Sequence, residues 1–181
     1  GQVHLMPLAD ARISMGFKVR ARGREASIGV GPALLGRIID ARGQAFNAST
    51  AMNLKEQVPL HHQKINPLDR EKISTRLHTG IHAIDALLPL GLGQRIGIFA
   101  GSGVGKSVLL GMIAKHIQSD VNVIALIGER GREVSDFIHN HLDEETLAKS
   151  VVVVACSDDF ALMRRQAAYT ETTMAKYFCP Q

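Results

Sequence analysis

A glycine-rich loop between two apolar segments is the first place where residue types and spacing in this sequence indicate chemistry. Residues 99–110 read FAGSGVGKSVLL, and the inner stretch AGSGVGKS has the spacing of a phosphate-binding loop. Backbone N–H groups can surround phosphate oxygens only where small residues let the chain curl, and the loop supplies Gly101, Gly103 and Gly105. We expect Lys106 to reach the β- and γ-phosphates and the Ser107 hydroxyl to ligate Mg²⁺.

The whole loop and the first helical turn after it are expected to contact the nucleotide. These candidate binding residues are Gly101, Ser102, Gly103, Val104, Gly105, Lys106, Ser107 and Val108. Ala100 stands where the usual motif opens with glycine, but the last residue of a strand needs only small size and extended dihedrals. A glycine-rich turn without a ligand is the alternative, and the strand-loop-helix context disfavours it.

A second polar cluster follows the next apolar segment, in LIGERGREV at residues 126–134. Since parallel strands end at the same sheet edge, Glu129 is expected beside the phosphate-binding loop, where it can orient a water for attack on the γ-phosphate. Glu133 could hold a Mg²⁺-bound water, and Arg130 and Arg132 bracket the site. The alternative for this cluster is an exposed helix start whose charges partly pair. Our candidate catalytic residues are Lys106, Glu129 and Arg130.

The elements that would position these residues alternate between strand and helix from residue 95 onward. The pattern predicts strands at 95–100, 121–128 and 151–156, with helical segments at 106–119, 134–141 and 160–177. The helix at 106–119 is expected to bury Leu109, Met112, Ile113, His116 and Ile117. This alternation is typical of an α/β fold with a parallel sheet and covering helices.

The first part of the chain has a different pattern. Residues 1–50 contain short runs of strand character separated by glycine turns, which predict an antiparallel sheet or part of a β-barrel. Residues 51–80 are polar, contain two prolines and are expected to be a surface connector. Residues 81–181 would then be the first part of a nucleotide domain. With few strands for a barrel and only three parallel strands, the chain is expected to be truncated at both ends.

Composition excludes several classes of protein. The chain has 181 residues, of which 45% are hydrophobic, and no apolar run is long enough to cross a bilayer or serve as a signal peptide. Two cysteines and the neighbouring His61 and His62 give neither a disulfide framework nor metal-ligand spacing. The net charge of +4 is spread along the chain with 4% aromatic residues, which disfavours a nucleic-acid groove. We expect a soluble cytoplasmic protein.

Longer motifs add a resemblance to a known family. The stretches TGIHAIDALLPLGLGQRIGIFAGSGVGKSVLLGMIA and ALIGERGREVSDFI resemble the catalytic subunits of the rotary hexameric ATPases. The loop AGSGVGKS is more similar to the ATPases of flagellar and virulence type III protein export than to the ATP synthase β subunit. The resemblance implies a RecA-like fold and a homohexamer that binds ATP and Mg²⁺. In it, Lys106 binds phosphate, Ser107 binds the metal, Glu129 is the catalytic carboxylate and Glu133 supports the metal waters.

The same resemblance implies a function and partners. They are ATP hydrolysis driving protein export, contacts with stator and stalk proteins, chaperones and exported proteins, and peripheral contact with an inner-membrane export gate. The Mg²⁺-directing aspartate, the arginine finger and the C-terminal helical domain of the family are expected beyond Gln181. Three alternatives stay open: a subunit of another rotary ATPase, a non-catalytic nucleotide-binding scaffold, and a hexameric RNA translocase.

Overall fold

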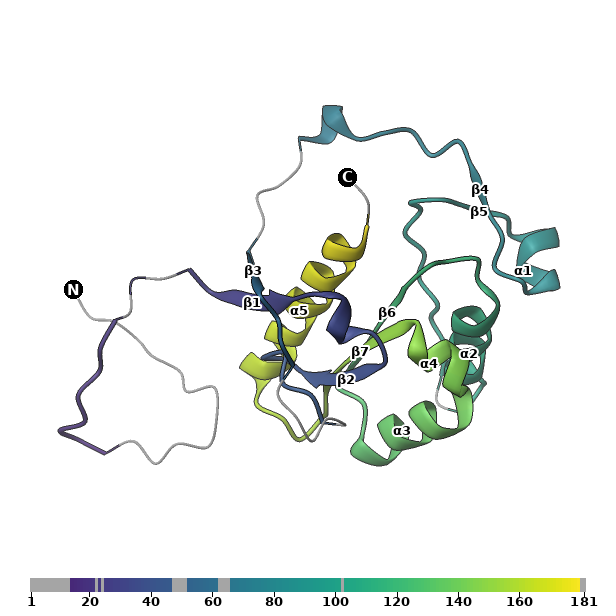
Figure 1. Cartoon of the computed structure of the whole chain (residues 1–181). Coiled ribbons are helices and arrows are strands. Elements are labelled where there is room, and N and C mark those ends of the chain that lie inside the picture. The colour runs from purple at the N-terminus through teal and green to yellow at the C-terminus, as the bar shows by residue number, and fades with distance from the viewer. Residues whose placement is uncertain are drawn as a thin grey trace.

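A three-stranded parallel sheet lies at the centre of the molecule (Figure 1). The structure is a computed structural model, and it describes residues 14–21, 23, 25–46, 52–61, 66–101 and 103–179. The sheet has the order β2-β7-β6, with β2 at Arg37–Asp40, β6 at Asn122–Ile127 and β7 at Ser150–Ala155. Both neighbours run parallel to β7, which confirms the predicted α/β class with a parallel sheet.

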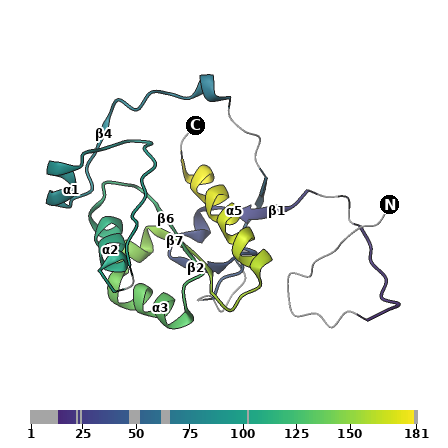
Figure 2. The ribbon, with the colours of Figure 1, turned by 180° about the vertical axis from the view of Figure 1, so that it is seen from behind.

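The central strand β7 is buried on both faces. Val151 and Val153 point into one apolar cluster, whereas Val152 and Val154 point into another on the opposite face. Successive side chains of a strand alternate between faces, so a continuous valine run fits a strand that is covered on both sides. Figures 1 and 2 show α5 on one side of the sheet and α2, α3 and α4 on the other.

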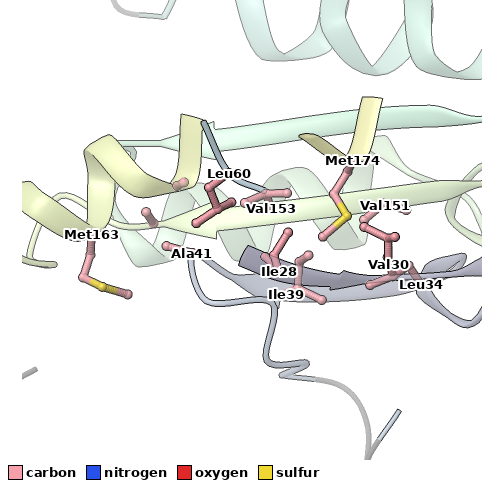
Figure 3. Close-up of a cluster of buried hydrophobic side chains, with 12 residues drawn as sticks. Ile28, Val30, Leu34, Ile39, Ala41, Leu60, Val151, Val153, Met163 and Met174 are labelled. Atoms are coloured by element: carbon pink, nitrogen blue, oxygen red, sulfur yellow. The ribbon is translucent and has the colours of Figure 1, made fainter. Parts of the chain in front are cut away.

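The α5 side holds the larger cluster. Helix α5, Ala161–Phe178, packs there with the antiparallel ribbon of β1, Ser27–Val30, and β3, Glu56–Pro59. Figure 3 shows side chains from β1, β2, β7 and α5 meeting in this cluster, with Met174 and Ile39 both fully buried. The predicted helical spacing of apolar residues along α5 therefore describes a real packed face.

The opposite face is covered by shorter pieces. Helix α3, Gly131–Asp136, continues as a π-helical turn at Phe137–His141, and α4 occupies Glu144–Ala148. Helix α2, Lys106–His116, follows the glycine-rich loop. Val134 and Phe137 carry the packing against the sheet here, in agreement with the helical spacing of the sequence.

The remaining elements are short. They are the 3₁₀ turns η1 at Pro32–Leu34 and η2 at Pro67–Asp69, the pair β4 at Arg76–Leu77 and β5 at Leu90–Gly91, and helix α1 at His82–Leu87. Gly80, just before α1, lies against the end of α2: a Cβ built on it would be 2.5 Å from the Cβ of His116. The α1 region is therefore in close contact with α2.

Two predictions about strands in the amino-terminal half are wrong. Residues 37–40 join the parallel sheet as β2, because Ile38 and Ile39 pack against clusters on opposite faces, and their antiparallel pairing is limited to an isolated bridge between Ile39 and Ala45. The predicted connector contains a strand, β3, because Val58 and Leu60 pack onto the larger cluster. The antiparallel character expected for the first part of the chain is found in the β1–β3 ribbon.

Two further predictions near the glycine-rich loop differ from the structure. Residues 95–100 are not a strand, since no strand of the described residues pairs with them and Phe99 is almost fully exposed. An extended segment without ladder partners leaves its backbone groups to solvent. Helix α2 does not bury the predicted apolar stripe; its buried residues are Gly111 and Ala114, and Met112 is exposed.

Candidate functional site

The carboxyl ends of β6 and β7 form the edge at which the candidate site lies. Gly128, with φ of 77°, turns the chain after β6, and its N–H donates to the Ala155 carbonyl at 2.7 Å. The Ser157 N–H donates to the Glu129 carbonyl at 2.9 Å. The backbone of Glu129 is thereby fixed where ligands of open α/β sheets bind.

The glycine-rich loop leaves room for a ligand. Gly103 and Gly105 have φ angles of 77° and 96°, a region in which side chains are strained. A Cβ added to either of them, or to Gly101, would meet nothing within 4 Å. The space beside these glycines is therefore not filled by other protein atoms. Gly105 is the N-cap of α2 and provides no side-chain cap, which leaves the first N–H groups of the helix available to an anion.

Lys106 and Glu129 come together at this point. The Lys106 Nζ lies 3.4 Å from the Glu129 Oε1, and the two side chains are 41% and 38% exposed. An ion pair that is this exposed is weak, so either partner can turn to a ligand at small cost. The structure brings the lysine that follows the loop to the carboxylate that follows the next strand.

The other charged residues of ERGRE are arranged differently. Arg130 is the N-cap of α3, and its Nη1 lies 3.6 Å from the Glu133 Oε1, with both side chains largely in solvent. Arg132 is also exposed. The arrangement of Arg130 and Glu133 agrees with the alternative that the sequence left open, an exposed helix start whose charges partly pair. The metal and catalytic roles of Glu133 and Arg130 stay predictions.

The rest of the predicted nucleotide contacts lie on the exposed side of the loop. Val104, Ser107 and Val108 are exposed around the start of α2, and Ser102 lies outside the described residues. Within the described part of the chain, no group of three or more His, Cys, Asp or Glu side chains could hold a metal ion. A Mg²⁺ site at Ser107 would therefore depend on the nucleotide for further oxygen ligands.

Residues at the far end of α2 were missed from the sequence. The Asn122 Nδ2 donates to the Ala114 carbonyl at 2.8 Å, and its Oδ1 accepts from the Ser119 hydroxyl at 2.7 Å. The only sequence signal is the stretch SDVN, at the junction of the predicted helix and the predicted strand. Asn side chains often bond nearby backbone groups at such ends, but the sequence does not say which carbonyl accepts.

Asp85 is a second residue that the sequence did not single out. Its carboxylate accepts hydrogen bonds from the Thr79 N–H and hydroxyl at 2.9 Å and from the Gly80 N–H at 3.1 Å. The bond from the Thr79 backbone is the main cause that lowers the pKa of Asp85. Asp85 thus shapes the turn that contacts the end of α2.

The cysteine and histidine interpretations can be compared with their surroundings. Burial and the nearby Asp159 and Asp158 raise the pKa of the Cys156 thiol, which disfavours a reactive thiolate. His61 packs edge-on against Tyr169, with ring centroids 4.8 Å apart, and His62 lies outside the described residues. In the described part of the chain, every helix is too short or too polar to cross a bilayer.

Comparison with known proteins gives relatives among flagellar and type III secretion ATPases. The flagellum-specific ATP synthase of Bacillus subtilis (strain 168) is 50% identical over 175 residues, which are 96% of this chain and 40% of the relative. The type 3 secretion system ATPase of Xanthomonas euvesicatoria is 47% identical over 166 residues, 92% of this chain and 38% of the relative. The resemblance to export ATPases is confirmed, and the chain spans about 40% of the length of these relatives.

Solved structures agree with the sequence relatives. A prototypical ATPase from the type III secretion system of pathogenic bacteria has a TM-score of 0.80 and 49% identity, covering 84% of this chain and 44% of that one. The assembled ATPase EscN in complex with its central stalk EscO, from enteropathogenic E. coli, has a TM-score of 0.80 and 51% identity, covering 84% and 38%. The family model described as ATP synthase alpha/beta family, nucleotide-binding domain, matches residues 80–181. Since this match covers more than half of the 181 residues, the chain belongs to the ATP synthase alpha/beta family.

Proposed function

We propose that this protein binds ATP in its glycine-rich loop and hydrolyses it. The observation that carries the proposal is the 3.4 Å separation of Lys106 Nζ and Glu129 Oε1 beside the uncapped start of α2. A phosphate-binding cation and a carboxylate that can orient water are the two protein groups that phosphoanhydride hydrolysis needs most. Family membership supports the same conclusion.

Binding would use the backbone and the first turn of α2. The residues that we propose as nucleotide contacts are Gly101, Ser102, Gly103, Val104, Gly105, Lys106, Ser107 and Val108. Their N–H groups and the helix dipole favour the negative phosphates. Mg²⁺ would be held by the Ser107 hydroxyl, with Glu133 reaching its waters, and would neutralise charge on the phosphates.

The ion pair of Lys106 with Glu129 gives these residues separate tasks once phosphate arrives. Lys106 turns toward the phosphate oxygens, and the released Glu129 carboxylate accepts a hydrogen bond from the attacking water. The water oxygen bonds to the γ-phosphorus while the bond to the β–γ bridging oxygen breaks, which yields ADP and phosphate. The exposed Arg130 guanidinium adds positive charge beside the same edge.

The biological role that we propose is protein export through a flagellar or virulence type III system. The names of the relatives support it, and the solved assembly of EscN in complex with its central stalk supports a ring that contacts a stalk protein. We propose that this ring is a homohexamer and that stator proteins contact it as well. Chaperones and exported proteins would be further partners, at the cytoplasmic face of an inner-membrane export gate. Residues 1–50 would be the end of a β-barrel domain, residues 51–80 would connect it to the next domain, and residues 81–181 would be the first part of the ATPase domain.

A Glu129→Gln substitution separates binding from chemistry. It keeps the shape and one hydrogen-bonding oxygen but removes the charge that orients water, so ATP turnover should fall by ~10²-fold or more while Mg·ATP binding is kept. A fluorescent ATP analogue in a titration, beside a phosphate-release assay, measures both quantities. Equal turnover in wild type and variant would favour a non-catalytic nucleotide-binding scaffold.

Assembly is tested by dilution of the intact protein. If neighbouring subunits complete each site, specific ATPase activity should rise with protein concentration as rings form. Sedimentation and turnover over one dilution series measure both, and a monomer with undiminished activity at the lowest concentration would contradict the ring.

A further inference from the structure

Helix α2 is poorly held by apolar packing, although it begins at the nucleotide loop. Ala114 is its one member of the cluster on that face of the sheet, and its other buried residue is Gly111. A groove of about 390 Å³ lies between α2 and β6, lined by apolar side chains that include Leu110, Ile113 and Ile124. Since side-chain packing does not close this groove, other contacts must fix the distance from α2 to β6.

Polar contacts connect α2 and β6 at both ends. At the site end, Lys106 faces Glu129, which follows β6. At the far end, Asn122, the first residue of β6, donates from Nδ2 to the Ala114 carbonyl. The last carbonyls of a helix lack intrahelical partners, so this bond also satisfies an otherwise unpaired group.

Asn122 makes two further hydrogen bonds besides the one to the Ala114 carbonyl. Its Oδ1 accepts from the Ser119 hydroxyl in the α2–β6 linker, and its backbone N–H donates to the Lys149 carbonyl at 3.0 Å, just before β7. A side chain held this firmly can transmit the position of the sheet to the helix. Lys115 also bonds Asp143, at 2.7 Å, but both of these side chains are substantially exposed, and such pairs stabilise little.

Gly111 gives α2 a pivot between its two ends. A Cβ on Gly111 would lie 2.7 Å from the His141 Cβ and 2.9 Å from its carbonyl oxygen, so the helix backbone touches the π-helical turn here. Lys106 lies about 7.5 Å along the helix on one side of this contact, and Ala114 lies about 4.5 Å on the other. Movement of the Ala114 end would therefore be enlarged at Lys106.

We propose that Asn122 is a positioning residue for the nucleotide site, because it sets the separation of Lys106 and Glu129 from the far end of α2. The proposal rests on the proposed ATPase function. Loss of the Asn122 bond to the Ala114 carbonyl frees α2 to rock about Gly111 and displaces Lys106 from Glu129. A displacement of ~1 Å at a catalytic group can reduce a rate by ~10²-fold.

The test is a double-mutant cycle in the intact protein. Asn122→Ala should lower kcat/KM for ATP by about tenfold at a temperature well below its melting point. In a Glu129→Gln background the same change should have a smaller effect than in wild type, because the carboxylate whose distance from Lys106 it alters is already absent. Equal losses in both backgrounds would overturn the positioning role and leave Asn122 as a structural residue.

Three variants serve as controls. Asn122→Asp keeps the side-chain volume and can still accept from Ser119 but cannot donate to Ala114, so it should lower turnover as alanine does; if the alanine variant does not fold, this variant carries the test. Lys115→Met removes a neighbouring exposed ion pair and should stay within about twofold of wild type, whereas Ser119→Ala removes a bond that orients Asn122 and should reduce turnover by no more than Asn122→Ala does. Wild-type turnover in Asn122→Asp would also overturn the proposal.

The two proposals fail in different ways. If Glu129→Gln leaves turnover unchanged, the proposed ATPase mechanism is wrong. If Glu129→Gln abolishes turnover while Asn122→Asp and Asn122→Ala do not reduce it, only the positioning role is wrong.

Discussion

Helices α5 and α2 lie on opposite faces of the same sheet and are held in different ways (Figures 1 and 2). Helix α5 buries Met163, Ala167, Thr170, Thr173 and Met174, and the Thr170 hydroxyl donates to the Ala41 carbonyl at 2.7 Å. Helix α2 buries only Gly111 and Ala114 and borders a groove. The well-packed helix supports the fold, whereas the glycine-rich loop precedes a helix that is held by a few polar contacts and by close backbone contacts at Gly111 and Gly80.

This difference suits a site that must respond to a ligand. Local opening costs least where few apolar contacts are broken, and ligand-binding loops are commonly found in such regions. Lys106 and Glu129 are both partly exposed, so phosphate can replace the carboxylate as the partner of the lysine. A helix packed as tightly as α5 would resist that adjustment.

The largest effect on activity is expected at the start of α2. Lys106→Ala removes the charge that we propose binds phosphate and removes no core contact, so ATP turnover should fall by ~10³-fold or more. The melting temperature should stay within about 1 °C, since exposed ion pairs contribute little stability. Calorimetry beside a phosphate-release assay checks both; a large loss of stability would contradict the contrast between the two helices.

The largest effect on stability is expected in α5. Met174 is fully buried, and Met174→Ala should lower the free energy of unfolding by about 3 kcal/mol through lost burial and a cavity. Met112→Ala in α2 is the matched control, because the Met112 side chain is exposed and its loss should cost under about 1 kcal/mol. Urea titrations of the two variants give the comparison, and similar losses would show that α2 is as firmly packed as α5.

An intermediate effect is expected at the pivot of α2. Gly111→Ala gains helix propensity but places a methyl group against His141, so the free energy of unfolding should fall by about 1–2 kcal/mol. Turnover should fall as well, because the helix must shift. Gly101→Ala is the control for fold stability, since a Cβ there meets nothing within 4 Å and should leave the urea midpoint unchanged. An unchanged midpoint for Gly111→Ala would mean that the helix is free at this contact.

How much of this was predictable from the sequence depends on the range of the interactions. The valine run of β7, the spacing along α5 and the glycine-rich loop are local patterns, and they predicted the sheet, a packed helix and the loop. The partner of β2 is more than 100 residues away at Val151–Val154, and no local pattern distinguishes that parallel neighbour from an antiparallel one. The face of α2 was predicted wrongly because apolar spacing assumes a neighbour to pack against, whereas the described residues leave a groove there.

The smallest effect concerns a carboxylate in the well-packed helix. Burial raises the pKa of Glu171 in α5, with a smaller opposing contribution from its hydrogen bond with Thr172. A raised pKa means that the folded state favours the protonated carboxyl group. The stability that the protonated Glu171 contributes is therefore fully present below the pKa of the unfolded state and is lost as pH rises through the pKa of the folded state. Glu171→Gln should therefore raise the melting temperature by about 1–2 °C at pH 7 and leave it unchanged near pH 4. Glu56→Gln makes the same chemical change at an exposed position of β3 and is the matched control for the substitution itself. Thermal melts of both variants at the two pH values make the measurement, and a lower melting temperature for Glu171→Gln at pH 7 would mean that the ionised carboxylate is stabilised in α5.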